Sequence, residues 1–98
     1  MSAYVVGQIQ IDDTEEYQKY LDGFLPSFQR HGGKLLATTK NSTEVIEGKW
    51  AYPNTVILEF PSLEAAHDWH TDPEYVELVS HRHKAAKTNL AIVDGFSE

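Results

Sequence analysis

The stretch NTVILEFPSLEAAHDWHTDPEYVELVSHRHKAA, residues 54–86, decides the fold class of this chain. Its first seven residues, 54–60, place apolar side chains in alternation and predict a β-strand. Residues 61–62, Pro-Ser, end that strand, and the serine is a natural N-cap for a helix through residue 70. Residues 72–73, Asp-Pro, start another helix, because proline costs nothing at the first helical position. The pattern is a strand followed by an interrupted helix.

The N-terminal part of the chain repeats this pattern. Residues 3–11, AYVVGQIQI, are rich in strand formers and predict a strand. The aspartates at 12–13 offer N-caps for a helix that begins near the next residue. We expect that helix to kink or break at 23–26, where a glycine and a proline interrupt it, before a second helical piece that carries Phe28. The glycines at 32–33 suit a left-handed helix end.

Four shorter segments complete the expected secondary structure. Residues 34–39, KLLATT, predict a strand, and residues 43–47, TEVIE, predict a short strand paired with it across a turn. Residues 48–53 form a loop, and residues 89–93, NLAIV, form the last strand. The order β-α-β-(β)-β-α-β predicts one α+β domain over residues 1–98. We expect a ferredoxin-like βαββαβ sandwich, in which the helices cover one face of an antiparallel sheet.

The expected strands carry apolar residues on both faces. Helices cover only one face of such a sheet, so the other face needs a different cover. A chain of 98 residues is also near the lower limit for burying a sufficient core on its own. A second copy is the simplest cover, and we therefore expect a homodimer.

Charge and composition exclude several classes of function. Fifteen acidic residues against eight Lys and Arg give a formal net charge of -7, and no basic run is present. Such a chain lacks the positive surface that nucleic acids and anionic membranes require, so neither is an expected partner. Without cysteine, the chain has no disulfide, thiolate nucleophile or zinc–thiolate site. No segment has the pattern of a signal peptide or membrane span, and a cytoplasmic location is expected.

Residues 56–86 also carry a family resemblance. Together with YVVGQIQIDDTEEYQKY at the start, GGKLL at 32–36 and EVIEGKW at 44–50, they resemble the domain-of-unknown-function 1330 family. The resemblance implies a dimeric α/β-barrel made of two ferredoxin-like protomers packed sheet against sheet. Related barrels include cofactor-free monooxygenases, haem-degrading oxygenases, lactone isomerases and muconate-pathway enzymes. Where many relatives have histidine on the first strand, this chain has Gln8, which cannot replace an acid–base histidine.

Three residues are candidates for catalysis. Arg82 shares an apolar helical stripe, where a guanidinium is costly to bury unless it is paired. It either clamps a carboxylate or enolate of a ligand or forms an internal ion pair, with Glu59 as the obvious partner. Glu59 interrupts an apolar strand, and burial between helix and sheet would suit a general base. The alternatives are that Glu59 only holds Arg82 or that it lines the dimer interface. His83 is better placed than His81 for acid–base work, because we expect it to share the stripe of Val76 and Val79.

Four further residues are candidates for ligand binding: Gln8, Tyr17, Tyr20 and His70. Aromatic residues that line a concave pocket suit a flat or apolar ligand, although the same rings equally fill a small core. His67 and His70 have a spacing found in metal sites, but a third ligand is missing from the pattern. We therefore expect neither a metal nor a cofactor.

The sequence leaves the function open between two classes. The first is a cleft that binds a small aromatic or carboxylated molecule and supports cofactor-free acid–base or oxygenase-like chemistry. In that case Glu59 or a histidine would take a proton, and Arg82 would stabilise the resulting anion. The second is a noncatalytic ligand-binding or structural dimer, in which the polar residues form ion pairs and caps. Haem degradation, with a histidine on the iron, is a more distant third interpretation.

Overall fold

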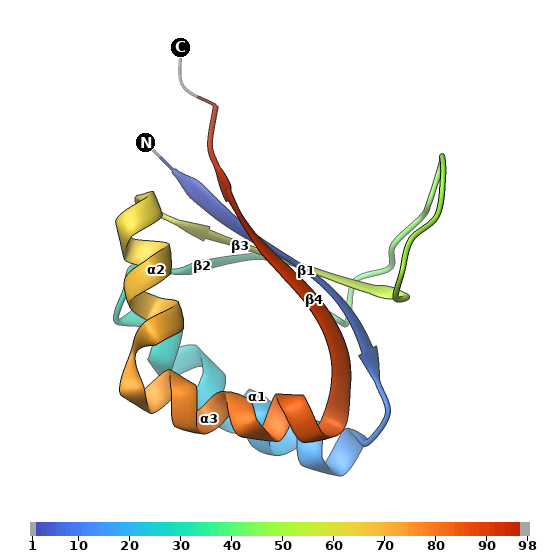
Figure 1. The fold of residues 1–98 in the computed structure, drawn as a ribbon, viewed down its shortest axis with the longest axis horizontal. Coiled ribbons are helices and arrows are strands. Elements are labelled where there is room, and N and C mark those ends of the chain that lie inside the picture. Colours follow the sequence, from blue (N-terminus) through green and yellow to red (C-terminus); the bar gives the residue numbers. More distant parts are fainter. Residues whose placement is uncertain (1, 97–98) are drawn as a thin grey trace.

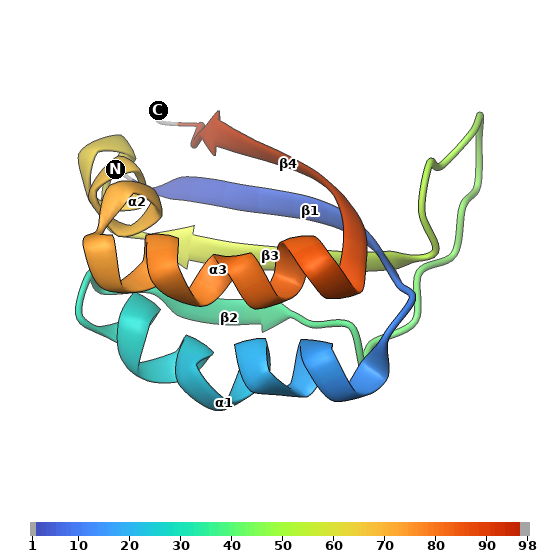
Figure 2. The ribbon, with the colours of Figure 1, turned by 60° about the horizontal axis from the view of Figure 1, so that its bottom comes forward.

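The computed structural model describes residues 2–96 and contains four strands and three helices (Figure 1). In chain order these are β1 (Ala3–Ile11), α1 (Thr14–Gln29), β2 (Lys34–Ala37), β3 (Asn54–Phe60), α2 (Leu63–Thr71), α3 (Pro73–Ala85) and β4 (Ala86–Asp94). The strands form one sheet in the order β2-β3-β1-β4, and all neighbours are antiparallel. All three helices lie on one face of this sheet (Figure 2). The expected ferredoxin-like α+β fold is confirmed.

The register of the central strand divides the sheet into two faces. Val5 lies opposite Leu58 on β3 and Ile92 on β4, and these three side chains share the face that the helices cover. Gln8 lies opposite Thr55 and Asn89 on the other face, which we call the open face. Cross-strand partners share a face, so this register fixes the side of the sheet to which every strand residue belongs.

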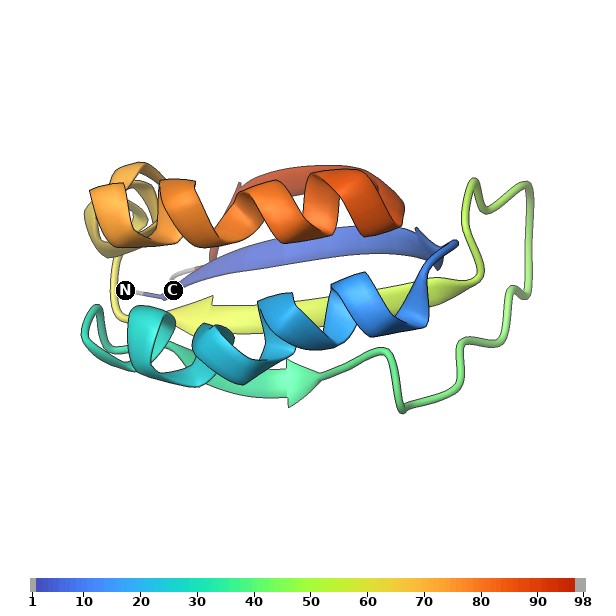
Figure 3. The ribbon, with the colours of Figure 1, turned by 90° about the horizontal axis from the view of Figure 1, so that it is seen from below.

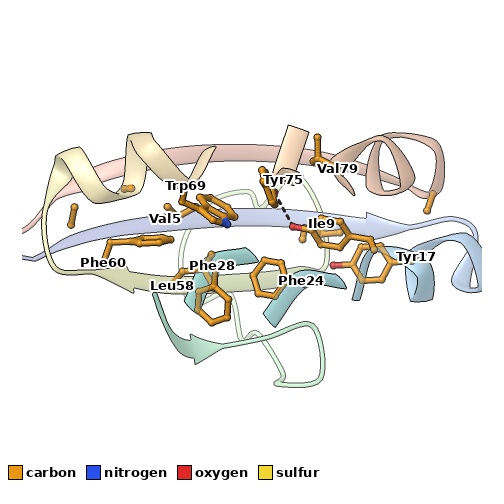
Figure 4. Close-up of a cluster of buried hydrophobic side chains, with 14 residues drawn as sticks. Val5, Ile9, Tyr17, Phe24, Phe28, Leu58, Phe60, Trp69, Tyr75 and Val79 are labelled. Atoms are coloured by element: carbon orange, nitrogen blue, oxygen red, sulfur yellow. Dashed lines mark hydrogen bonds between the residues drawn. The ribbon is translucent and has the colours of Figure 1, made fainter. Parts of the chain in front are cut away.

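The core between the sheet and the helices is largely aromatic (Figure 4). Trp69 of α2 packs against Phe60 of β3 and Tyr75 of α3, with ring centroids 5.3 Å and 4.3 Å away. Phe24 of α1 closes the cluster with its ring edge-on to Trp69. The cluster therefore joins all three helices to the sheet and sets the distance between the helices and the sheet.

Helices α1 and α3 run side by side beneath the sheet (Figure 3). They lie close together at Gly23, where an added Cβ would lie 2.8 Å from Cδ1 of Leu78. The predicted break near Pro26 is wrong, because α1 continues through this residue to Gln29. Phe24 and Phe28 on either side of the proline are both buried and stack with centroids 4.7 Å apart. Packing of both rings holds the helix together despite the missing N–H.

The segment from residue 38 to residue 53 contains no helix or strand. The predicted strand over 43–47 is therefore wrong, and β2 ends at Ala37 instead of residue 39. The segment projects beyond the sheet (Figures 1 and 2), and Ile46 within it is 90% exposed. With no layer against which to pack, its apolar residues gain nothing from strand pairing. Strand β4 is longer than predicted, because it pairs with β1 as far as Ala86 opposite Ile11.

Between residues 2 and 96, none of the helices is long and apolar enough to span a bilayer.

Candidate functional site

A cavity of about 310 Å³ lies between the helix-covered face of the sheet and the helices. All four strands contribute to its roof, and all three helices contribute to its floor and sides. Its apolar lining is broad and includes aromatic rings from each helix. The residues that matter for its chemistry are Tyr17, Tyr20, Lys40, Trp69, Tyr75, Arg82 and Thr88. The cavity combines an apolar body with a few polar groups, as ligand sites do.

Arg82 is the central charged group of this cavity. It belongs to the inward stripe of α3 that includes Tyr75 and Val79, and it is only 5% exposed. No Asp or Glu among residues 2–96 pairs with its guanidinium, which instead lies 5.6 Å from the ring centroid of Tyr20. A buried cation without a carboxylate partner is destabilising, so its presence against a cavity points to a ligand anion.

Tyrosine hydroxyls surround this cation. The hydroxyls of Tyr20 and Tyr75 are hydrogen-bonded at 2.9 Å (dashed in Figure 4), which links α1 to α3 across the cavity. Burial raises the pKa of the Tyr17 hydroxyl, although the charge of Arg82 opposes this. Burial also raises the pKa of Tyr20 well above its ordinary range. Both phenols therefore stay protonated at neutral pH and serve as hydrogen-bond donors.

The charge inside the cavity is opposite to that of the whole chain. The chain carries a formal net charge of -7, yet the charged residues that line the cavity are Arg82 and Lys40. Within the part of the chain that the structure describes, no carboxylate and no imidazole reaches the lining. The cavity thus offers positive charge and hydroxyl donors to a ligand, and it offers no ordinary general base.

Glu59 does not lie where the sequence interpretation placed it. It sits opposite Tyr4 and Lys34 on the open face of the sheet, while Leu58 and Phe60 on either side face the helices. The expected burial of Glu59 between helix and sheet and its pairing with Arg82 are therefore wrong. Gln8 is also on the open face, away from the cavity. The alternation of side chains along a strand separates both residues from Arg82.

The two candidate histidines also lie outside the cavity. His83 follows Arg82 on α3 but is exposed, because the inward stripe of that helix passes through Tyr75 and Val79. His70 is exposed on α2, with its ring centroid 6.1 Å from that of the buried Trp69. Over residues 2–96, no three His, Asp or Glu side chains gather into a group that could hold a metal ion. Of the seven sequence candidates, the structure brings together Tyr17, Tyr20 and Arg82.

Four of the residues named for the cavity were not among the candidates. Trp69 and Tyr75 belong to the aromatic residues that also fill the core, and the position of Tyr75 on the stripe of Arg82 was a usable signal. Thr88 lines the cavity at the start of β4, and its Oγ1 is buried without a hydrogen-bond partner in the described region. Lys40 reaches the cavity from the segment after β2, and no periodicity could have placed it there.

Two histidine–carboxylate pairs hold together the helices that enclose the cavity. His81 of α3 contacts Glu16 in the first turn of α1, and His31 after α1 lies 2.8 Å from Asp72 at the start of α3. The hydrogen bond from His81 lowers the pKa of Glu16 below its ordinary 4.5. The hydrogen bond from His31 lowers the pKa of Asp72 below its ordinary 3.8. The pairs lie near opposite ends of α1.

These pairs predict a loss of stability in acid. Both carboxyls have a lower pKa in the folded chain than in the unfolded chain. Their contribution to the free energy of unfolding is therefore complete at a pH above the unfolded pKa, and it disappears as the pH falls through the folded pKa. We expect Glu16→Gln to lower the urea midpoint at neutral pH, and we expect this difference to shrink as the pH falls below the ordinary pKa of Glu16 and its carboxyl takes up a proton. A midpoint difference that persists unchanged in acid would show that Glu16 acts through packing and not through this ion pair.

The fold and cavity define a class: ferredoxin-like α+β domains with a small-molecule-sized cavity between the sheet and the helices. Within that class, residues 2–96 match the model of a domain of unknown function, DUF1330, and the chain belongs to this family. No curated protein matches the sequence.

Solved structures with the same fold come from several bacteria. A protein of unknown function from Rhodopseudomonas palustris is 22% identical, with a TM-score of 0.76 over 99% of this chain and 84% of that one. SnoaB, a cofactor-independent oxygenase from Streptomyces nogalater, is 8% identical, with a TM-score of 0.64 over 99% and 95% of the two chains. A DABB family protein with a ferredoxin-like fold from Mesorhizobium loti is 14% identical, with a TM-score of 0.60 over 98% of each chain. At these identities the likeness shows the fold alone.

Proposed function

We propose that this protein binds a small organic anion, with an aromatic or other apolar body, in the cavity beneath Arg82. The observation that carries the proposal is the buried guanidinium without a carboxylate partner among residues 2–96, facing a lining of apolar and hydroxyl groups. A carboxylate or enolate placed there gains charge-assisted hydrogen bonds in a setting of low dielectric constant. The rings of Phe24 and Trp69 supply the apolar contact.

Catalysis on the bound molecule is the second candidate function. SnoaB, which shares the fold, is described as a cofactor-independent oxygenase, and a cation that stabilises an enolate suits such chemistry. Proton abstraction by Glu59 or His83 is not favoured, because neither residue lines the cavity. The absence of carboxylate and imidazole from the lining contributed by residues 2–96 favours binding, with any reaction depending on the acidity of the ligand itself.

Titration calorimetry with benzoate and its uncharged analogue benzamide tests the binding proposal. We expect benzoate to bind and Arg82→Gln to weaken it by roughly ten- to a hundredfold, the size of a hydrogen bond to a charged group. Lys84→Gln is the matched control, because it removes a cation from the exposed side of the same helix and should leave binding unchanged. Equal binding of benzoate and benzamide, or equal affinities in the wild type and Arg82→Gln, would contradict the proposal.

We propose in addition that the protein is a homodimer that packs through the open face of the sheet. That face carries Val6 of β1 between Ile57 of β3 and Ala91 of β4, and Tyr4 beside Val93. The helices lie on the opposite side and leave these apolar residues without cover within the chain (Figure 1). Packing against the same face of a second copy would remove these apolar side chains from water in a symmetric dimer.

Light scattering and native mass spectrometry of the purified protein test this assembly. We expect a dimer at micromolar concentration, and we expect Ile57→Glu to give a monomer because it places a charge on the apolar face. Val76→Glu is the control, since Val76 is an equally apolar but exposed residue on the helical side. A monomeric wild-type protein would rule out the homodimer.

A further inference from the structure

The proposed binding function leads to a sharper expectation about the ligand. We propose that the cavity takes weakly acidic phenols and enols and holds them as phenolates and enolates, so that the bound hydroxyl ionises more readily than in water. This inference rests on the proposed anion site and adds the protonation state and the chemical class of its ligand. The proton leaves the ligand oxygen for solvent as the anion binds, so no protein group has to accept it.

The charge balance inside the cavity favours an ionised ligand. Arg82 is buried at the cavity wall, and no described Asp or Glu neutralises it. An opposite charge within about 4–6 Å lowers the pKa of an acid by roughly 1–3 units, and low dielectric surroundings strengthen the effect. A phenol held beside this guanidinium therefore gains from losing its proton.

The balance of hydrogen-bond donors and acceptors in the lining also favours an ionised ligand. Tyr17 and Tyr20 remain protonated. The hydrogen bond between Tyr20 and Tyr75 uses the hydroxyl hydrogen of one of these two residues and leaves that of the other free. Oγ1 of Thr88 and Nε1 of Trp69 are buried without partners in the described part of the chain, and both residues line the cavity. The polar groups are thus rich in donors.

A neutral phenol brings a further O–H donor into this lining. Among residues 2–96 the lining offers that O–H only hydroxyl oxygens and the amide of Gln18 as acceptors, whereas a phenolate oxygen accepts from several of the hydroxyl donors and from Arg82 at once. Donors left unsatisfied in a buried site destabilise the complex. The excess of hydrogen-bond donors and the unpaired charge of Arg82 therefore both favour the ionised form of the ligand.

The titratable groups around Arg82 act in the same direction. On α1 these are Tyr17 and Tyr20, whose hydroxyls stay protonated, and on α3 the nearest is Tyr75, which is hydrogen-bonded to Tyr20. Lys40, from the segment after β2, is the other charged lining residue and adds a second positive charge. The roof strands contribute the hydroxyl of Thr88 and apolar side chains. Within the described region no lining group opposes ionisation of the ligand.

The size and surface of the cavity restrict the ligand further. A volume of about 310 Å³ is at the lower end of the range of roughly 300–1,000 Å³ for ligand sites. The rings of Phe24 and Trp69 and the aliphatic side chains of Val5 and Leu58 form its apolar walls. This lining fits a small planar molecule with one ionisable oxygen directed at Arg82.

A pH titration with 4-nitrophenol tests the inference, because its phenolate absorbs visible light and its neutral form does not. Equilibrium dialysis first measures how much dye the protein binds, and absorbance against pH then gives the pKa of the bound dye. We expect that pKa to fall by roughly one unit or more relative to free dye in the wild type and in Lys84→Gln. The shift should vanish in Arg82→Gln and in Arg82→Met, two variants that differ in polarity and so guard against a folding artefact.

The outcomes separate the inference from the binding proposal. Dye that binds to the wild type with an unshifted pKa, or with a shift that survives in both Arg82 variants, overturns the inference and leaves the cavity as a binding site. Failure of wild-type protein to retain either 4-nitrophenol or benzoate overturns the anion site itself, and the inference falls with it.

Discussion

Replacement of Trp69 by alanine is expected to lower the free energy of unfolding by about 3–5 kcal/mol, as for other large buried aromatic residues. Trp69 is only 1% exposed and packs against Phe60, Tyr75 and Phe24, so its loss separates all three helices from the sheet. Such a loss is a large part of the 5–15 kcal/mol that stabilises a typical domain. Urea denaturation at one fixed protein concentration measures it and removes any contribution from assembly.

His70→Ala is the matched control for Trp69→Ala. His70 is the next residue of α2, but its side chain is exposed, and a surface substitution usually changes stability by about 0.5 kcal/mol or less. We therefore expect the two neighbouring variants to differ by several kcal/mol. Similar losses in both variants would mean that Trp69 is not the centre of the core.

Arg82→Met is expected to make the protein more stable, raising the free energy of unfolding by about 1–3 kcal/mol. Methionine fills a similar volume without the cost of burying an unpaired charge, and replacement of buried charges by apolar residues is often stabilising. The same variant should lose its affinity for benzoate. If Arg82 serves ligand binding and not the stability of the fold, its replacement should raise stability and remove binding.

A clear destabilisation by Arg82→Met would contradict this assignment. It would show that the guanidinium makes internal contacts that stabilise the fold, as the ion-pair interpretation of the sequence had it. Lys84→Met tests the effect of charge removal alone, because Lys84 is exposed two positions further along the same helix. We expect that variant to remain within about 0.5 kcal/mol of the wild type.

Much of the fold follows from local patterns. The strand over 54–60, its proline–serine end and the capped helix at Pro73 all lie where the sequence predicts them. These elements combine a strong period with an explicit start or stop signal. The segment 43–47 has strand-forming residues but no layer to pack against, and tertiary context therefore overrode its propensity. The helix through Pro26 shows the opposite case, in which packing maintained an element that local chemistry interrupts.

The site was predictable only in part. Arg82 could be found because a charge on an apolar helical stripe is conspicuous in the sequence, and Tyr17 and Tyr20 follow from helical spacing. The predicted location of Glu59 was wrong for a physical reason. The sequence shows that Glu59 alternates with Leu58 and Phe60, but it does not show which face of the strand the helices cover. Lys40 depends on the path of an irregular segment, which carries no period at all.

A crystal structure with 4-bromobenzoate, located by the anomalous signal of bromine, tests the central claim most directly. The account predicts a bromine peak inside the cavity between the sheet and helices α1 and α3, with the carboxylate hydrogen-bonded to the guanidinium of Arg82. A cavity filled by side chains, or an Arg82 paired with a carboxylate of the protein while the ligand binds elsewhere or not at all, would contradict it.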